Sequence, residues 1–265
     1  MNQLSPNELS ILLVEPSDTQ RKIITQKLRE EEISSIQTAA NVAEAKDIIS
    51  RHKPDLIASA MHFDDGSAID LLNHLKADSR YQDIQFMLVS SETRREHLEI
   101  FRQSGVVAIL PKPFNAEHLG KAINATIDLL SHDELDLSHF DVQDLRVLVV
   151  DDSRMARNVV KRTIGNLGMR QITEAEDGAQ AIALMKQQMF DLVITDYNMP
   201  SVDGLALTQF IRNESQQSHI PILMVSSEAN DAHLSNVSQA GVNALCDKPF
   251  EPQLVKKLLH QLLSE

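Results

Sequence analysis

The stretch "FDLVITDYNMPSVDG" (residues 190–204) places a continuous apolar run before a polar loop that ends in glycine. Such a run, with no polar alternation, is typical of a strand that is buried on both faces of a parallel sheet. The run ends on Asp196. A related stretch, "PDLIASAMHFDDG" (54–66), has Ala60 at the equivalent position. The sequence therefore predicts the same buried strand twice, once with a carboxylate at its end and once without.

The chain repeats at a single offset of 136 residues. Fixed-period similarity of this kind indicates a duplicated structural unit. In 265 residues it predicts two domains, at 8–131 and 145–265, joined by an acidic linker at 132–144. The matching positions are Glu15 with Asp151, Ala60 with Asp196, Ser90 with Ser226, and Lys112 with Lys248.

Short apolar runs alternate with segments of helical period in both repeats. In the second repeat, "RMARNVVKRTIGNLG" (154–168) has apolar residues three and four apart and ends on a glycine. Alternating strands and helices indicate a parallel sheet covered on both faces. We therefore expect an α/β fold of two flavodoxin-like doubly wound domains, each with a five-stranded parallel sheet flanked by helices. The predicted strands of the second repeat are "RVLVVD", "QITEAE", "LVITD", "ILMVS" and "ALCDKP".

Composition and charge exclude several classes of protein. The hydrophobic share of 42% and charged share of 24% are ordinary for a globular domain. No apolar run approaches the length of a membrane span, and the N-terminus lacks the pattern of a signal peptide, so we expect a cytoplasmic protein with no membrane contact. The formal net charge of −13 argues against nucleic-acid binding, which needs clustered Lys and Arg. The lone Cys246 excludes an internal disulfide and is predicted to be a buried strand residue.

Five polar residues of the second repeat fall at predicted carboxyl ends of strands: Asp151, Asp152, Asp196, Ser226 and Lys248. In doubly wound sheets such positions converge on one site. Three carboxylates in one crevice repel each other unless a cation or protons relieve them, and hard oxygen ligands suit Mg²⁺. With a fixed lysine charge and a hydroxyl donor, this set supports phosphoryl transfer. Neither a P-loop nor a GxGxxG motif accompanies it, so bound nucleotide is not expected.

At these motifs the second repeat resembles a receiver domain of bacterial two-component signalling, of the stand-alone CheY-like kind. The matching motifs are "VVDDS", "ITDYNMPSVDG", "MVSSE" and "DKPF". Matched residue by residue, the resemblance implies that Asp196 is the phosphoacceptor and that Asp151 and Asp152 are the metal-binding acid pair. It also implies that the main-chain carbonyl of Asn198 completes the shell of a Mg²⁺ cofactor.

The resemblance further implies that Ser226 and Lys248 hold the phosphoryl oxygens. One position departs from the family. Many receivers have an aromatic residue three before the conserved lysine, and this chain has Leu245. The aromatic part of the usual switch is therefore absent, and the resemblance does not say how phosphorylation reaches the surface; a loop rearrangement driven by Ser226 is one way.

The first repeat lacks most of this chemistry. Glu15-Pro16 stands where the second repeat has two aspartates, and proline offers no ligand. Ala60 cannot accept a phosphoryl group, His62 stands at the position of the asparagine, and the loop to Gly66 is expected to be two residues shorter. We therefore expect Mg²⁺ to bind poorly or not at all, and the first domain resembles a degenerate pseudo-receiver.

Two consequences for the first repeat remain open at this point. Asp64 or Asp65 is an alternative acceptor, although both lie beyond the expected strand end. Lys112, which has lost its aspartate partner, is predicted to pair with Glu15 and to hold the domain in one conformation. Ser90 is retained.

The sequence predicts a response regulator without a separate output domain. A histidine kinase or phosphotransfer protein would phosphorylate Asp196, and the altered domain would bind or release an unknown downstream protein. The pseudo-receiver would serve as an interaction or dimerisation module, with a homodimer as one outcome. The only enzymatic activity expected is Mg²⁺-dependent self-phosphorylation and autodephosphorylation. Alternatives are a phosphate sink or phosphorelay intermediate and a constitutive scaffold; a metal-dependent phosphate-ester hydrolase is least favoured.

Overall fold

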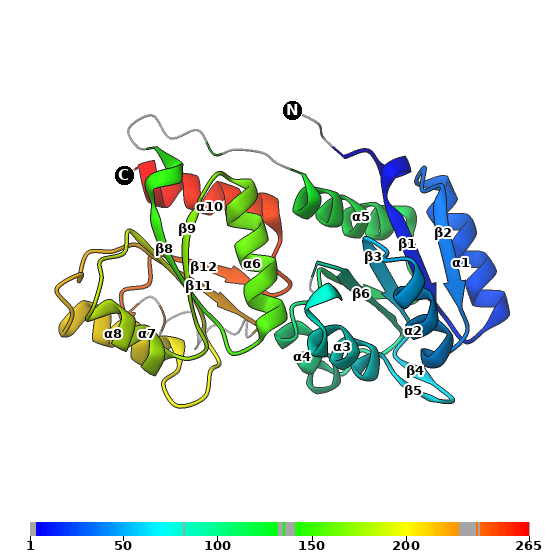
Figure 1. Ribbon diagram of the computed structural model, residues 1–265, viewed down its shortest axis with the longest axis horizontal. Helices are drawn as coiled ribbons and strands as arrows, with labels where there is room; N and C mark the ends of the chain where they lie inside the picture. The colour runs from blue at the N-terminus through cyan, green and yellow to red at the C-terminus, as the bar shows by residue number, and fades with distance from the viewer. Residues whose placement is uncertain are drawn as a thin grey trace. The chain divides into compact units, whose positions relative to one another are not determined.

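The computed structural model describes residues 4–81, 83–131, 135, 141–227, 237 and 239–264. The chain divides into two compact units, Met1–Ser131 and His132–Glu265. Each unit contains a five-stranded parallel sheet (Figure 1). The strand order is β2-β1-β3-β6-β7 in the first unit and β9-β8-β10-β11-β12 in the second. The expected fold of two flavodoxin-like domains is confirmed.

The first unit alternates strands and helices along the chain. Its sheet is formed by β1 (Ser10–Val14), β2 (Ser35–Ala39), β3 (Leu56–Ser59), β6 (Gln85–Ser90) and β7 (Ala108–Pro111). Its helices are α1 (Asp18–Glu30), α2 (Val42–Arg51), α3 (Ala68–Ala77), α4 (Arg95–Gln103) and α5 (Ala116–Leu130). A small antiparallel hairpin, β4 (His62–Phe63) and β5 (Gly66–Ser67), follows β3.

The second unit repeats this pattern. Its strands are β8 (Arg146–Val150), β9 (Gln171–Ala175), β10 (Leu192–Asp196), β11 (Ile222–Ser226) and β12 (Ala244–Asp247). Its helices include α6 (Arg154–Asn166), α7 (Gly178–Met185), α8 (Gly204–Asn213) and α10 (Pro252–Ser264). Figure 1 shows α6 and α10 on one side of the sheet and α7 and α8 on the other. The helix predicted between β11 and β12 and most of the predicted linker fall on residues 228–236, 238, 132–134 and 136–140, outside the described residues.

The central strands of the second unit are buried on both faces. Every residue of β10 and β11 is buried, as the continuous apolar runs predict. Helices cover the two faces because each presents an apolar side to the sheet. Removing this apolar surface from water contributes roughly 25 cal/mol per Å², the main favourable term in forming the unit. Cys246 is part of this core, as predicted, and burial raises the pKa of its thiol to about 12.

The strand register brings the ends of β8, β10, β11 and β12 to one edge of the sheet. Val150 pairs with Thr195, the residue before Asp196, and Ser226 pairs with Asp247, the residue before Lys248. Residues that follow these strands therefore start from the same edge. This edge is where the sequence predicts the polar site.

The loop after β3 corrects one expectation. The amide of Ala68 donates to the main-chain oxygen of Met61, and the amide of Gly204 donates to that of Tyr197. Both bonds keep the offset of 136, so the two loops have equal length, and the prediction that the first is two residues shorter is wrong. Gly66, which was matched to Gly204, lies instead in β5. The structural counterpart of Gly204 is Ala68.

Glycines of the second unit allow its loop to pack closely. The amide of Gly178 donates to the main-chain oxygen of Val202 at 3.0 Å, and a Cβ on Gly178 would lie 2.6 Å from that oxygen. A Cβ on Gly204 would overlap the main-chain oxygen of Asp196. Only glycine permits these approaches, so Gly178 and Gly204 fix the path of the chain around Asp196.

Candidate functional site

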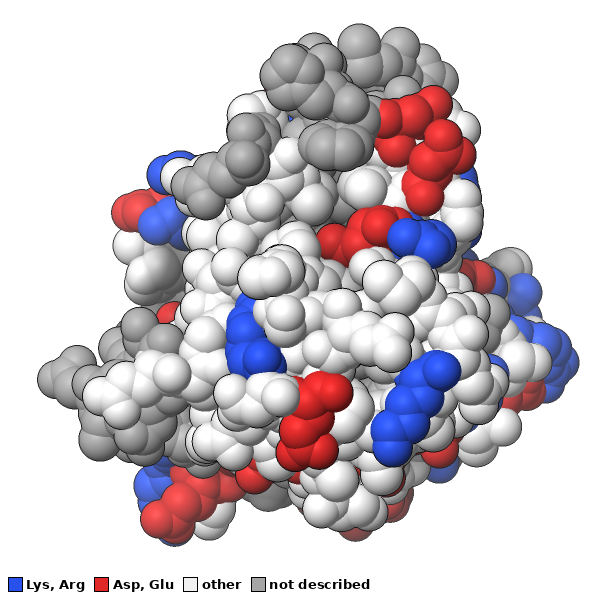
Figure 2. All heavy atoms as spheres, turned by 90° about the vertical axis from the view of Figure 1, so that its left-hand side faces the viewer, with Lys and Arg blue, Asp and Glu red and all other residues white. Residues whose placement is uncertain are grey.

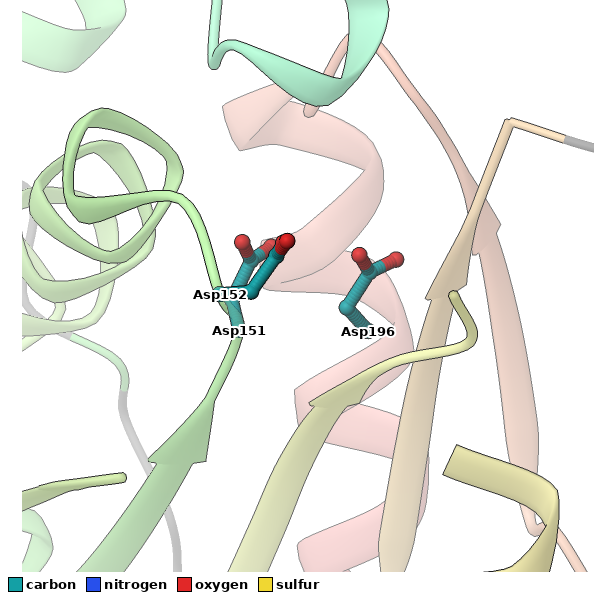
Figure 3. A group of neighbouring side chains, drawn as sticks. All are labelled: Asp151, Asp152 and Asp196. Carbon is teal, nitrogen blue, oxygen red and sulfur yellow. The ribbon is translucent and has the colours of Figure 1, made fainter. Parts of the chain in front are cut away.

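Three carboxylates meet at the carboxyl edge of the second sheet. Asp151 and Asp152 come from the turn after β8, and Asp196 ends β10; in Figure 3 all three point to the same side. One carboxylate oxygen from each lies within 4.8 Å of the others. Asp151 and Asp196 are buried, whereas Asp152 is exposed. The structure thus brings together the three acids that the sequence predicts as metal ligands.

Asp151 is held in place by bonds to its main chain and its side chain. Its amide donates to the main-chain oxygen of Ala175 at 3.2 Å. Its Oδ1 accepts from the amide of Ser153 at 2.8 Å, and the Ser153 hydroxyl in turn caps α6. The start of α6 therefore fixes the carboxylate of Asp151.

Lys248 lies between two of the acids. Its Nζ is 3.0 Å from Asp151 Oδ2 and 3.0 Å from Asp196 Oδ2. Its amide donates to the main-chain oxygen of Ser226 at 2.8 Å, which ties it to β11. The contact with Asp196 is an ion pair; among the described residues no group directs a well-formed hydrogen bond at either Asp196 oxygen. Asp196 therefore has a neighbouring charge but unused acceptor capacity.

The electrostatics of the site favour uptake of a cation. Burial raises the pKa of Asp196 to about 7, with Lys248 opposing this shift and Asp151 adding to it. Burial also raises the pKa of Asp151. Burial acts to lower the pKa of Lys248, but the two carboxylates outweigh it and raise that pKa. One lysine cannot neutralise three acids, so a divalent cation would relieve the remaining repulsion.

The donor set fits Mg²⁺. The three acids supply hard oxygen atoms, which Mg²⁺ prefers, and although Lys248 pairs with Oδ2 of Asp196, Oδ1 has no partner among the described residues. Asn198 lies two residues after Asp196 in the loop before α8, where its side chain is exposed. Its predicted role uses the main-chain oxygen, and the side chain is not needed for it.

The remaining predicted residues lie at or near the same edge. Ser226 is the buried last residue of β11. Leu245, the residue in place of the usual aromatic, is half-buried in β12 and pairs with Met224. The roles of Ser226, Asn198 and Leu245 stay predictions.

The corresponding edge of the first unit has the same frame with different chemistry. Lys112 Nζ lies 2.6 Å from Glu15 Oε2, so the predicted ion pair is present. The other carboxylate oxygen, Oε1, accepts from the amide of Ser17 at 3.0 Å. Ala60 is buried and offers no oxygen ligand from its side chain. Glu15 thus uses both oxygens to hold the frame, and Lys112 already has its counter-charge.

Asp65 is engaged elsewhere in the first unit. Its carboxylate accepts from the amides of Val42 at 3.0 Å and Ala43 at 2.9 Å, and these bonds lower its pKa. The carboxylate therefore occupies the N-terminus of α2, where the second unit uses the main-chain oxygen of Val202 to bind Gly178. This position argues against Asp65 as an alternative phosphoacceptor.

The sequence analysis missed one buried charged residue near the acids. Arg157, in α6, donates from Nη1 to the main-chain oxygen of Asp151 at 2.7 Å. Arg21 makes the same contact with the main-chain oxygen of Glu15 in the first unit. Both arginines lie six residues after the contacted residue and keep the offset of 136, which is the pattern that would have identified them.

The distribution of charged side chains on one face of the molecule bears on whether that face could bind nucleic acid. On the face drawn in Figure 2, the described Lys and Arg side chains stand among Asp and Glu side chains and form no continuous stripe across the face. That face does not present the basic stripe that follows a phosphate backbone. Among the described residues, no helix is both long and apolar enough to span a membrane.

Comparison with known proteins identifies the family. The model of the response regulator receiver domain matches residues 11–124 and 147–260, and each end of the second match lies 136 residues after the corresponding end of the first. Chemotaxis protein CheY-3 of Vibrio cholerae is 36% identical over 120 residues, covering 45% of this chain and 92% of that protein. A CheY homologue of Campylobacter jejuni is 39% identical over 120 residues, with 45% and 92% coverage.

A solved structure shows a related resemblance. It is the receiver domain of a sensor histidine kinase from Pseudomonas aeruginosa, with a magnesium ion coordinated in its active-site cleft. It is 27% identical and covers 46% of this chain and 98% of its own, with a TM-score of 0.43.

The two matches to the receiver-domain model span most of the residues of both units. The chain therefore belongs to the response regulator receiver family and is a two-component response regulator with two receiver domains in tandem.

Proposed function

We propose that the second receiver is the phosphorylated switch of this protein and that Asp196 accepts the phosphoryl group from a histidine kinase or phosphotransfer protein. The supporting observation is the buried Asp196 carboxylate, which lies beside Lys248 and the acid pair and has no directed hydrogen-bond donor among the described residues.

Mg²⁺ would be held by Asp151, Asp152 and Asp196 together with the main-chain oxygen of Asn198. When bound, it would neutralise charge on the transferring phosphoryl group and orient that group. The protein's own contribution is the arrangement of these oxygens, which the β8–α6 turn and the end of β10 set before any ligand arrives.

In the transfer step, a carboxylate oxygen of Asp196 forms a bond to phosphorus while the bond from phosphorus to the donor histidine nitrogen breaks. The electron pair of that bond leaves with the nitrogen. Lys248 offers positive charge to the phosphoryl oxygens, and the Ser226 hydroxyl offers a hydrogen bond. Catalysis then rests on positioning and electrostatics, as is general for phosphoryl transfer.

The first receiver would act without phosphorylation. Ala60 provides no acceptor, and the Glu15–Lys112 pair occupies the groups that would otherwise serve the reaction. We assign it the role of a pseudo-receiver that supplies an interaction or dimerisation surface. The phosphorylated second receiver would then signal by binding or releasing a downstream protein.

Phosphorylation of the whole chain tests this function. With Mg²⁺ and acetyl phosphate, the native protein should give one shifted band on a phosphate-affinity gel. Asp196→Asn should abolish the band, while Asp191→Asn, which removes an Arg146 partner at the opposite end of β10, should keep it. Ala60→Asp should not add a second band, because Pro16 supplies no ligand and Glu15 still holds Lys112. A band that survives Asp196→Asn would contradict the proposal. Rapid loss of phosphate without any change in partner binding would instead favour the phosphate sink.

The raised pKa of Asp196 predicts a pH dependence of stability. Because the folded-state pKa of about 7 exceeds the usual 3.8, the native state retains this proton more strongly than the unfolded state. Without divalent cations, the free energy of unfolding should therefore fall as pH rises from about 4 to 7. Asp196→Asn should remove this loss and stabilise the protein at pH 8 by an amount on the order of a few kcal/mol.

Urea unfolding of both proteins at pH 5 and pH 8, in the presence of EDTA, measures this difference. The free energy of unfolding of the Asn variant should exceed that of the unsubstituted protein by more at pH 8 than at pH 5. Addition of Mg²⁺ at pH 8 should reduce the difference in unfolding free energy between the two proteins, because the ion stabilises only the protein that retains Asp196. An equal difference in unfolding free energy between the two proteins at pH 5 and pH 8 would show that the Asp196 carboxylate does not titrate in this range.

The Glu15–Lys112 pair predicts a stability effect in the first receiver. Glu15→Gln would leave Lys112, whose side chain is 22% exposed, without its counter-charge. We expect a loss of about 1–3 kcal/mol, below the range for a fully buried pair because water reaches the lysine. Nuclear magnetic resonance shifts of the backbone near Lys112 should also change. Glu117→Gln, which removes an exposed pair with Lys121, is the matched control and should leave stability unaffected. Unchanged stability and shifts in Glu15→Gln would rule out a structural role for the pair.

A further inference from the structure

Arg157 is a buried charge whose role is not explained by its place in a helix. It belongs to α6 and is only 6% exposed. Its Nη1 donates to the main-chain oxygen of Asp151 at 2.7 Å. That oxygen belongs to the peptide that joins Asp151 to Asp152. The guanidinium therefore holds the peptide between two of the predicted metal ligands.

Two carboxylates hold the other side of the guanidinium. Nε lies 3.1 Å from Glu174 Oε2, and Nη2 lies 3.2 Å from Glu176 Oε1. Glu174 belongs to β9, and its second oxygen pairs with Lys161 Nζ at 2.6 Å. Arg157 is thus fastened to the edge of the sheet at one side and to the acid-bearing turn at the other.

The first receiver makes only half of this arrangement. Arg21 donates to the main-chain oxygen of Glu15, but the positions that match Glu174 and Glu176 are Thr38 and Ala40, which carry no charge. Arg21 pairs instead with Asp18, whose side chain is 80% exposed. Of the two partners of Arg157, Glu176 is 75% exposed and Glu174 is the better covered at 37%. The carboxylate support occurs in the receiver that has the complete acid pair.

The geometry of arginine explains why such a support matters. Its planar guanidinium has five donors in a fixed fork, so contacts on one side set the direction of the others. Fixing one donor on Glu174 of β9 and a second on Glu176, just after that strand, therefore fixes the direction of Nη1 and, through it, the peptide of Asp151. The charges also balance, because Arg157 and Lys161 oppose Glu174 and Glu176. The group can orient the acids without adding net positive charge beside a cation.

We propose that Arg157, held by Glu174 and Glu176, is a positioning residue for the Mg²⁺ ligands Asp151 and Asp152. This inference rests on the proposed function, since it presumes that the acid pair binds Mg²⁺. Arg157 itself touches neither the metal nor the phosphoryl group. It acts by setting the orientation of the peptide between the two acids.

Calorimetric titration of the full-length protein with MgCl₂ tests the proposal. Arg157→Lys keeps a positive charge but cannot bind both glutamates and the main-chain oxygen together. Its dissociation constant for Mg²⁺ should rise about tenfold, the lower end of the range for groups that orient metal ligands. Arg21→Lys removes the matching contact in the first receiver and should leave Mg²⁺ affinity unchanged.

A second variant separates positioning from folding. Glu174→Gln with Glu176→Gln keeps Arg157 in place but removes its charged support, and it should also weaken Mg²⁺ binding, by less than Arg157→Lys. Amide hydrogen exchange of α6 and β9 peptides should show that both remain folded. Native Mg²⁺ affinity in the glutamine double variant, or in a folded Arg157→Lys, would overturn the proposal. Failure of the native protein to bind Mg²⁺ would instead overturn the proposed function.

Discussion

The second receiver depends on one buried lysine placed between two buried carboxylates. Lys248 lies 3.0 Å from an oxygen of Asp151 and 3.0 Å from an oxygen of Asp196. Charges this well buried are tolerated only when they are paired, so the lysine is what permits the two acids to lie so close together. Because a third acid, Asp152, has no share in this pairing, the site retains an excess of negative charge. That excess is the physical basis of the metal binding and phosphoryl transfer that we propose at Asp196.

The first receiver satisfies the same constraint with fewer charges. Within the described part of the chain Lys112 pairs with one carboxylate, that of Glu15, and Ala60 replaces the second. The pair is balanced, so it contributes no excess charge that would attract a cation. The frame around it is nevertheless the same, since the amides of Lys112 and Lys248 donate to the main-chain oxygens of Ser90 and Ser226 at 2.8 Å in both cases. The duplication thus preserves a fold while removing the charge imbalance on which the proposed chemistry depends.

The sequence predicted the parts of this structure that follow from local pattern. Continuous apolar runs predicted the buried strands, and the common edge of a parallel sheet predicted that Asp151, Asp152 and Asp196 converge. The offset of 136 predicted the Glu15–Lys112 pair. Sequence pattern gave a wrong prediction where contacts between distant segments determine the structure. The loop after β3 was aligned by matching Gly66 to Gly204, although the main-chain hydrogen bonds show that the counterpart of Gly204 is Ala68. Contacts of Arg157 were missed for the same reason, because its glutamate partners lie in and just after a different strand, β9.

The central claim is that one receiver has a working metal site and the other has none. The stoichiometry of Mg²⁺ binding to the full-length protein, measured by calorimetry at pH 8, tests it most directly. The account predicts one specific Mg²⁺ per chain, lost in Asp151→Asn with Asp152→Asn and retained in Glu15→Gln. Two specific ions per chain, or one ion that survives loss of the second receiver's acid pair, would contradict it.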